Sequence, residues 1–370
     1  MKELVIGGKT VSNDTPALII AEAGINHDGS LNQALRLIDM AADAGADVVK
    51  FQLFTAKYMY PKTGGSFTTA NGKEVDIYNL IEEAEMPEVW IPRLMEHCEK
   101  RKVGFLCTTC DEKSTDILEK YSVDAYKIAS SEITHLPLLK YTASKGKTMI
   151  ISEGACRLKD VAEAIDEIQA CGNSSIALMH CTVEYPAEMK YCNMNLIETY
   201  RKIFPDAVIG FSDHTMDPSL APVHAIIKGA KIIEKHITVD KTLPGADHCY
   251  ALEFHELKKM VEDIRAAERS PELFALNDEI LGKYCKDVEE GELIEYHFIH
   301  RGIFSISDIK SGDLLTSENI AVLRPGNSEN GLSPKMYEVI LNHGVRANRD
   351  IPMSTPIVWE DILNLQDVES

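Results

Sequence analysis

AVIGFSDHT at residues 207–215 and KIIEKHIT at residues 231–238 are two short runs rich in apolar residues, and each carries a histidine near its end. A helical pattern follows each run. Short apolar runs followed by helices are typical of parallel strands that present polar residues at their carboxyl ends. His214 and His236 are therefore expected at the ends of two neighbouring strands. A pair of imidazoles in that position suggests a metal site. Imidazole ligands suit Mn, Fe, Co or Zn better than Ca.

The same alternation of strand and helix runs through most of the chain. The predicted strands are 17–23, 47–54, 103–109, 125–130, 148–154, 176–182, 207–213 and 231–237. The predicted helices are 30–44, 87–101, 112–120, 135–144, 158–171, 193–203, 218–228 and 254–268. Eight such repeats predict an α/β fold in which a (β/α)8 TIM barrel closes. An open doubly wound sheet is the alternative, but no G-x-G-x-x-G follows the first predicted strand.

The sequence changes character after the last predicted helix. Short strand-like pieces and glycine-marked turns replace the β/α alternation there, which indicates a second, smaller domain. The expected division is a barrel over 1–285, an acidic linker over 286–297 and the small domain over 298–370. Within the barrel, the connection at 55–86 is long and contains the turn-rich KTGGSFTTANGK of residues 62–73, which predicts a flap.

Composition narrows the class of protein. The formal net charge of -20 over 370 residues argues against nucleic acid as a partner, because phosphate backbones require a basic surface. No stretch approaches the ~18 apolar residues of a membrane span, and the first residues lack a signal-peptide pattern. Nine scattered cysteines are expected to be reduced in a cytoplasmic protein, and the C-x-x-C of Cys107 and Cys110 has no second pair at zinc-site spacing.

Polar side chains lie near the end of almost every predicted strand. They are Glu22, Lys50, Gln52, Thr108, Lys127, Ser130, Ser152, His180, Ser212, His214, Glu234 and His236. Because active sites of such barrels lie at the carboxyl ends of the strands, these groups are expected to converge. Two lysines inside strands, Lys50 and Lys127, indicate a clamp for a phosphate or a carboxylate. The alternative for Lys50 is a structural ion pair with a glutamate of the barrel.

Two of these residues have open roles. Glu22 ends the first predicted strand, which neighbours the eighth in a closed barrel. It could act as a general base or as a metal partner, or it could form a salt bridge with Lys50. His180 is a weaker catalytic candidate because apolar residues flank it in the run MHCT.

At these residues the chain resembles the sialic acid (N-acetylneuraminate) synthase family, which includes legionaminic and pseudaminic acid synthases. The resemblance lies in IAEAGINHDGS (20–30), DVVKFQLF (47–54), AYKIASSEITHLPLL (125–139), HCTVEYP (180–186), IGFSDHT (209–215) and IIEKHITVDK (232–241). DIKSGDLLTSENIAVLRPGN (308–327) is similar to the family's antifreeze-like SAF domain, a β-clip. The resemblance covers nearly the whole chain.

The resemblance implies a transferase that condenses phosphoenolpyruvate with N-acetylmannosamine or a related N-acylated hexose. The products are a nine-carbon 2-keto sugar acid and phosphate, released by C–O cleavage. It also implies a divalent metal, usually Mn²⁺ with Mg²⁺ or Co²⁺ as alternatives, and a homodimer with swapped SAF domains. The protein is expected to be cytoplasmic and to have no nucleic acid or membrane partner.

The resemblance further assigns roles to individual residues. It implies that Lys50, Thr108, Lys127, Ser130 and Ser152 hold phosphoenolpyruvate, and that His214 and His236 bind the metal. It places Glu22, Glu234 and Asp247 at the reacting centre as catalytic residues, with Gln52, Tyr185 and Ser212 among the substrate-binding residues. It implies that Arg324 is supplied by the partner subunit, near the acyl group of the sugar.

The chain departs from the family pattern at a few positions. Val183 stands where many members carry a polar residue, and Glu153 replaces the threonine of a common STG pattern. The stretch AEMKYCNMN of residues 187–195 also differs from the usual small and acidic residues. These positions are expected near the sugar, so they leave open whether the acceptor is N-acetylmannosamine or a diacetamido hexose.

Two other functions compete with this one. A lysine Schiff-base aldolase on the same barrel would use Lys127 or Lys50 as its nucleophile, but it leaves the histidine pair without a task. A non-catalytic sugar-binding protein is the second alternative, and the density of ionisable groups at the strand ends argues against it.

Overall fold

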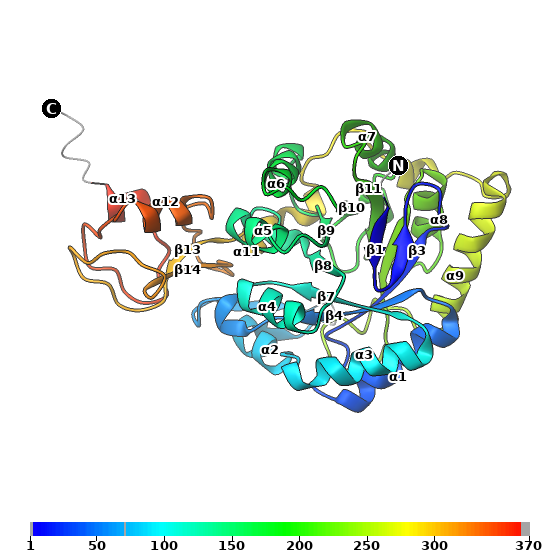
Figure 1. Ribbon diagram of the computed structural model, residues 1–370, viewed down its shortest axis with the longest axis horizontal. Coiled ribbons are helices and arrows are strands. Elements are labelled where there is room, and N and C mark those ends of the chain that lie inside the picture. Colours follow the sequence, from blue (N-terminus) through cyan, green and yellow to red (C-terminus); the bar gives the residue numbers. More distant parts are fainter. Residues whose placement is uncertain (1–2, 70–71, 364–370) are drawn as a thin grey trace.

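A closed barrel of eight parallel strands forms the larger part of the molecule (Figure 1). The computed structural model describes residues 3–69 and 72–363. The barrel order is β10-β11-β12-β3-β4-β7-β8-β9, so the predicted TIM barrel is confirmed. Its strands are β3 (Leu18–Gly24), β4 (Val48–Leu53), β7 (Gly104–Thr109), β8 (Ala125–Ile128), β9 (Thr148–Ser152), β10 (Ile176–Cys181), β11 (Val208–Asp213) and β12 (Ile232–His236).

Helices surround the barrel close to their expected positions. They are α1 (Leu31–Ala44), α3 (Ile91–Arg101), α4 (Glu112–Lys120), α5 (Leu136–Ala143), α6 (Leu158–Ala170), α7 (Asn195–Ile203), α8 (Leu220–Ile227) and α9 (Phe254–Arg269). Local signals set their ends: at α1, the Ser30 side chain accepts a hydrogen bond from the Gln33 amide. Gly45 then ends α1 in the left-handed conformation, with φ of 91°. Within the described ranges, no helix is long and apolar enough to cross a membrane.

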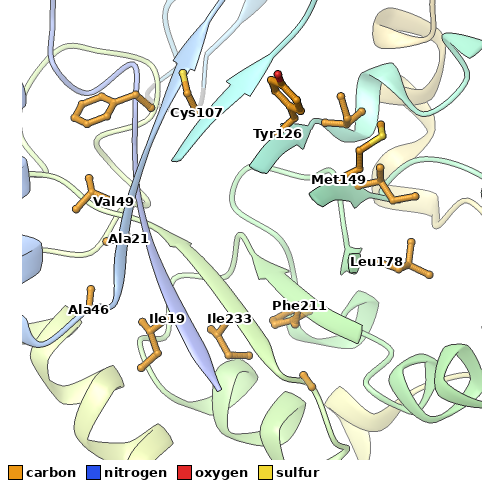
Figure 2. Close-up of a cluster of buried hydrophobic side chains, with 14 of the residues drawn as sticks. Ile19, Ala21, Ala46, Val49, Cys107, Tyr126, Met149, Leu178, Phe211 and Ile233 are labelled. Atoms are coloured by element: carbon orange, nitrogen blue, oxygen red, sulfur yellow. The ribbon is translucent and has the colours of Figure 1, made fainter. Parts of the chain in front are cut away.

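Side-chain alternation along the strands divides the barrel into two apolar cores. Residues that point outward, such as Ile19, Val49, Tyr126 and Phe211, pack in a large buried cluster with helix residues (Figure 2). Residues that point inward, such as Ile20, form a separate buried cluster inside the barrel. Alternate residues of a strand face opposite sides, so the inward positions nearer the carboxyl ends are the ones that remain for polar groups.

An N-terminal hairpin that the sequence reading missed contributes to the interior core. Strands β1 (Leu4–Ile6) and β2 (Lys9–Val11) pair antiparallel across the Gly7–Gly8 turn. Both glycines have positive φ, 57° and 75°, as a two-residue hairpin turn requires. Leu4, Ile6 and Val11 are buried in the cluster inside the barrel, away from the strand ends that carry polar residues.

The predicted flap is a small structured unit. It contains β5 (Ser66–Thr68) paired with β6 (Glu74–Asp76), followed by α2 (Ile77–Glu83). Residues 70–71 of this segment lie outside the described residues. A buried apolar cluster that includes Phe54, Tyr60 and Ile77 holds the segment against the barrel.

The C-terminal unit has its own core and lies at one end of the molecule's long axis (Figure 1). It contains β13 (Gly302–Ser305) paired antiparallel with β14 (Ile320–Leu323), and the helices α12 (Met336–Asn342) and α13 (Trp359–Ile362). Before it comes α11 (Leu293–Ile299), so the end of the expected linker is helical, whereas α10 (Asp278–Leu281) lies in the expected barrel domain. The domain boundaries at 285/286 and 297/298 stay predictions, and residues 364–370 of the predicted domain lie outside the described residues.

Truncating the hairpin should destabilise the barrel. Ile6 is fully buried, whereas its neighbour Val5 is 44% exposed. Ile6→Ala is expected to lower the free energy of unfolding by about 2–5 kcal/mol, because it leaves a cavity in the interior core. Val5→Ala, the matched control, is expected to change it by less than about 0.5 kcal/mol. Urea unfolding measures both, and equal effects would show that the hairpin does not seal the barrel.

Candidate active site

One cavity of about 260 Å³ lies at the carboxyl ends of the barrel strands. It brings together all the residues to which the family resemblance assigned a catalytic, substrate-binding or metal-binding role. They are Glu22, Lys50, Gln52, Thr108, Lys127, Ser130, Ser152, Tyr185, Ser212, His214, Glu234, His236, Asp247 and Arg324. This convergence follows from strand alternation, since the strand residues among them occupy inward positions near the carboxyl ends.

Two lysines and two glutamates form the charged floor of the cavity. Lys50 Nζ lies 3.3 Å from Glu22 Oε2 and 3.2 Å from Glu234 Oε1, and Lys127 Nζ lies 4.0 Å from Glu234 Oε1. The alternative of a structural ion pair for Lys50 is therefore present, and its burial does not require a bound anion. The two roles are compatible because Lys50 and Lys127 both line the cavity, so the ion pairs leave them accessible to a bound anion.

The two carboxyl groups of the floor differ in acidity. Burial raises the pKa of Glu22 to about 7, an effect that Lys50 opposes and Glu234 reinforces. Burial also acts to raise the pKa of Glu234, but Lys127 and Lys50 outweigh it and lower this pKa to about 2. Glu22 is therefore the carboxyl group that can exchange a proton near neutral pH, whereas Glu234 stays ionised.

Hydroxyl groups surround the lysines on one side of the cavity. Lys127 Nζ donates to Ser152 Oγ at 2.6 Å, and Lys50 Nζ donates to Thr108 Oγ1 at 3.2 Å. Ser130 Oγ accepts a hydrogen bond from the Gly154 amide at 3.0 Å. Ammonium and hydroxyl donors that converge in this way suit a phosphate or a carboxylate. Burial lowers the pKa of Lys127, and Glu234 opposes that shift.

The two histidines face each other on the opposite side, with ring centroids 5.4 Å apart. Burial lowers the pKa of both rings, that of His214 to about 4, so both are neutral. The Nδ1–H of His214 donates to the Thr182 carbonyl at 2.7 Å, which leaves Nε2 as the lone-pair nitrogen. In the described chain, the buried His236 Nδ1 has no hydrogen-bond partner, and Asp247 Oδ2 lies 3.8 Å from it.

These features fit a divalent metal with open coordination positions. Neutral imidazoles with free lone pairs are the ligating form of histidine. Among the described residues, no group of three or more His, Cys, Asp or Glu side chains is arranged to hold a metal. Any ion on the two rings would therefore complete its coordination with water or substrate.

An ion pair behind the strands fixes the direction of the histidines. Lys235 and Asp213 are outward-facing, fully buried and paired with each other. Lys235 Nζ also donates to the Thr215 carbonyl at 2.6 Å, so β12 is joined to the loop after β11. This contact holds the backbone on both sides of His214 and leaves both imidazoles on the inner face.

Arg324 reaches the cavity from the C-terminal unit of the same chain. It pairs with Glu132 at 2.5 Å and donates to Ser131 Oγ at 2.5 Å, both in the loop after β8. Arg301 pairs with the other side of the Glu132 carboxylate and so anchors β13 to the barrel. Arg324 thus lines the cavity of its own chain, and its supply by a partner subunit, which the family resemblance implies, stays a prediction. The exchange of SAF domains between subunits stays a prediction.

Two residues that the sequence reading put near the reaction lie elsewhere. His180 Nδ1 is 2.6 Å from Glu153 Oε1 and its Nε2 donates to the Cys192 carbonyl, outside the cavity. Glu153 is fully buried and pairs with Lys286, so its expected place beside the sugar is wrong. His180 lies outside the cavity because alternate residues of a strand share a face, and Leu178 and His180 both face outward on β10. Of the other two departures, Val183 does line the cavity, whereas no residue of 187–195 is among its lining residues.

Most of the other cavity residues were missed because no strand end marks them. They come from the flap, from α11 and from loops, and include Met59, Tyr60, Ile77, Leu80, Ser131, Tyr250, Glu295 and Phe298. Phe54 and Cys181 also line the cavity and were missed although they lie at the ends of predicted strands. Tyr250 packs against His236 at 5.3 Å and Tyr185 against His214 at 4.3 Å between ring centroids. The flap and linker residues form a mainly apolar wall opposite the charged floor. Only tertiary packing identifies them.

Comparisons with known proteins identify the family of the chain. Residues 37–272 match the model of the NeuB family, and residues 300–363 match the SAF domain. The spore coat polysaccharide biosynthesis protein SpsE of Bacillus subtilis is 50% identical, covering 98% of this chain and 98% of the relative. Its crystal structure superposes with a TM-score of 0.87 at 48% identity, covering 98% and 99% of the two chains.

A relative of named activity is also similar over almost its whole length. The N,N'-diacetyllegionaminic acid synthase of Legionella pneumophila is 34% identical, covering 96% of this chain and 97% of the relative. The family resemblance noted in the sequence is thus confirmed, as is the SAF assignment of the C-terminal unit. The chain belongs to the NeuB family and carries a SAF domain after its barrel.

Proposed function

We propose that this protein condenses phosphoenolpyruvate with an N-acylated hexose to give a nine-carbon 2-keto sugar acid and phosphate. The observation that carries the proposal is one cavity with buried Lys50 and Lys127 on one side and neutral His214 and His236 on the other. The lysine side suits the anionic substrate, and the histidine side suits a metal that polarises an aldehyde. Family membership supports the same reaction.

The lysines, the hydroxyl groups and Glu22 have separate roles in the proposed reaction. Lys50 and Lys127 offset the charge of phosphate and carboxylate, with Thr108, Ser130 and Ser152 as hydrogen-bonding groups. C3 of phosphoenolpyruvate attacks the aldehyde carbon, so that a C–C bond forms while the electron pair of the C=O π bond moves onto the aldehyde oxygen. That oxygen takes up a proton, and positive charge develops at C2. Glu22, whose pKa is about 7, takes a proton from the water that adds to C2. Phosphate then leaves with its bridging oxygen as the C2–O bond breaks.

The proposed metal ligands are His214 and His236, with Asp247 beside them. A divalent ion such as Mn²⁺ bound there would act as a Lewis acid toward the sugar's carbonyl oxygen. The chain's own contribution is orientation, because the Thr182 carbonyl fixes the ring of His214. Tyr185, Gln52 and Ser212 are proposed as substrate-binding groups and Glu234 as the fixed negative charge of the floor.

The apolar wall favours an acceptor with fewer hydroxyl groups than N-acetylmannosamine. Phe54, Met59, Leu80 and Phe298 line the cavity without offering hydrogen bonds from their side chains. A sugar hydroxyl against this wall would lose its water without gaining a partner, whereas a methyl or acetyl group would not. A 6-deoxy-diacetamido hexose is therefore the acceptor we favour, in line with the name of the Legionella relative.

One observation favours the competing Schiff-base aldolase. Burial lowers the pKa of Lys127, which raises the share of nucleophilic free amine. The same nitrogen donates at 2.6 Å to Ser152 Oγ, however, and lies near the ionised Glu234. Borohydride reduction in the presence of pyruvate would trap a Schiff base on Lys127. We expect no covalent adduct by mass spectrometry.

Phosphate release tests the proposed reaction directly. We expect release from phosphoenolpyruvate with Mn²⁺ only when a suitable sugar is present, with a product three carbons longer than the acceptor. A panel should include N-acetylmannosamine and 6-deoxy-diacetamido hexoses, and a chelator should abolish release. Sugar-dependent release that persists in chelator would contradict the metal role. No release with any acceptor would contradict the reaction.

Loss of one imidazole should remove the metal while the fold survives. His236→Ala is expected to weaken Mn²⁺ binding and to lower kcat by about 100-fold, because a single ring remains as ligand. Calorimetric titration with Mn²⁺ gives a readout that does not depend on activity. The exposed His255→Ala serves as the control. Unchanged Mn²⁺ affinity in His236→Ala would refute the assignment.

Removal of the Arg324 guanidinium should raise KM for the sugar more than KM for phosphoenolpyruvate. Arg324→Ala is expected to raise KM for the sugar by about tenfold or more, since a charged hydrogen bond is lost. KM for phosphoenolpyruvate should change little. The exposed Arg346→Ala, in the same unit, is the control. A larger effect on phosphoenolpyruvate than on sugar would show that Arg324 has another role.

A further inference from the structure

A buried carboxylate in the expected linker joins two loops at the mouth of the barrel. Glu292 is fully buried, although it lies in a run of acidic residues that reads as a solvated spacer. Its Oε1 accepts hydrogen bonds from the Ala155 amide at 2.7 Å and from the Val183 amide at 2.8 Å. These two amides belong to the loops that follow β9 and β10. One side chain therefore fixes two neighbouring strand ends.

Glu292 and His300 hold the backbone of Ala155 from both sides. Ala155 has a φ of 49°, in the left-handed region that costs a non-glycine residue about 1–2 kcal/mol. Its amide donates to Glu292, and its carbonyl accepts a hydrogen bond from His300 Nε2 at 2.5 Å. Such a conformation persists only where surrounding contacts determine it. Here residues of the linker and of the junction with the SAF domain supply those contacts.

A buried ion pair fixes the start of the same segment. Lys286 Nζ lies 2.6 Å from Glu153 Oε2, and the other oxygen of Glu153 faces His180. His180 contacts Glu153 through one ring nitrogen and the Cys192 carbonyl through the other, so this cluster also joins the turn to the loop after β10. Glu153 directly follows β9 and precedes the Gly154–Ala155 turn. The linker is thus attached to this turn at two points.

This turn also orients two serine hydroxyl groups on the lysine side of the cavity. The Gly154 amide donates to Ser130 Oγ at 3.0 Å, and Ser152, two residues before it, accepts from Lys127 at 2.6 Å. A Cβ placed on Gly154 would lie 2.3 Å from Val183 Cγ2, so the two loops pack without spare room. A shift of the turn would therefore displace Ser130, Ser152 and the wall at Val183 together.

We propose that Glu292 is a positioning residue for the phosphoenolpyruvate half of the site, with His300 as its second support. The inference rests on the proposed function for its substrate, but the contacts themselves do not depend on it. Through the turn at 153–155, the segment between barrel and SAF domain sets the hydroxyl groups that accompany Lys127. Neither Glu292 nor His300 contacts Lys50 or Lys127, so both act on the site through the turn.

Kinetics on three variants test the proposal. Glu292→Ala removes the acceptor for two amides, Glu292→Gln retains a side-chain oxygen that can accept from them, and the exposed Glu290→Ala is the matched control. Glu292→Ala is expected to lower kcat/KM for phosphoenolpyruvate by about 10- to 100-fold. KM for the sugar should rise by a smaller factor, because Val183, which is expected near the sugar, moves with the turn. Glu292→Gln should recover most of the loss, and Glu290→Ala should match the wild type.

Hydrogen exchange provides a readout without catalysis. In Glu292→Ala, peptides that contain Ala155 and Val183 should exchange faster, while peptides from α9 should not. If Glu292→Ala does not fold, His300→Leu tests the same turn and should lower kcat/KM for phosphoenolpyruvate in the same direction. The wild type assayed in parallel separates the two proposals, because its failure to release phosphate would count against the reaction alone.

Three results would overturn the positioning role. The first is a folded Glu292→Ala with wild-type kinetics for phosphoenolpyruvate. The second is an equal rise in KM for both substrates, which would indicate general loosening of the site. The third is unchanged exchange at Ala155 and Val183, which would refute the contact whatever the activity.

Discussion

The pairing of Lys50 and Lys127 with Glu22 and Glu234 is the interaction on which the site depends. Four ionisable groups inside a barrel would each pay a desolvation penalty of several kcal/mol if left alone. Here each charge lies next to an opposite one, and the arrangement leaves the ion pairs open toward a cavity rather than sealed. The quartet is therefore stable without a ligand and still able to receive one. It also separates the acidities of the two carboxyl groups.

The barrel alone does not complete this site. Its strands supply the charged floor, while the flap, the linker and the SAF domain supply the opposite wall and Arg324. The double contact of Glu132 with Arg301 and Arg324 ties the SAF domain to the loop that carries Ser130. The proposed role of Glu292 follows the same logic. Residues far along the chain hold loops whose own sequence does not fix their conformation.

Strand positions and strand-end residues could be read from the sequence because period and polarity are local properties. Lys50 in VVKFQL and His236 in IIEKH are charged or polar residues inside apolar runs, and the barrel rule places them together. His180 shows the limit of this reasoning. It also ends an apolar run, but its register on β10 turns it outward, toward the helices. Counting alternate positions from Cys181 would have given the correct face.

The sequence by itself determined the barrel, the SAF domain, the family and the set of polar residues at the strand ends, since each of these depends on patterns of neighbouring residues. The tertiary structure alone decided the apolar wall, the packing of the N-terminal hairpin inside the barrel and the pairing of Glu153 with Lys286. It also decided that Arg324 reaches the cavity of its own chain. These features are contacts between residues distant in sequence, and their energies depend on burial and on the approach of opposite charges. No local pattern encodes that proximity, because it arises only when the barrel closes and the C-terminal segments pack against its mouth.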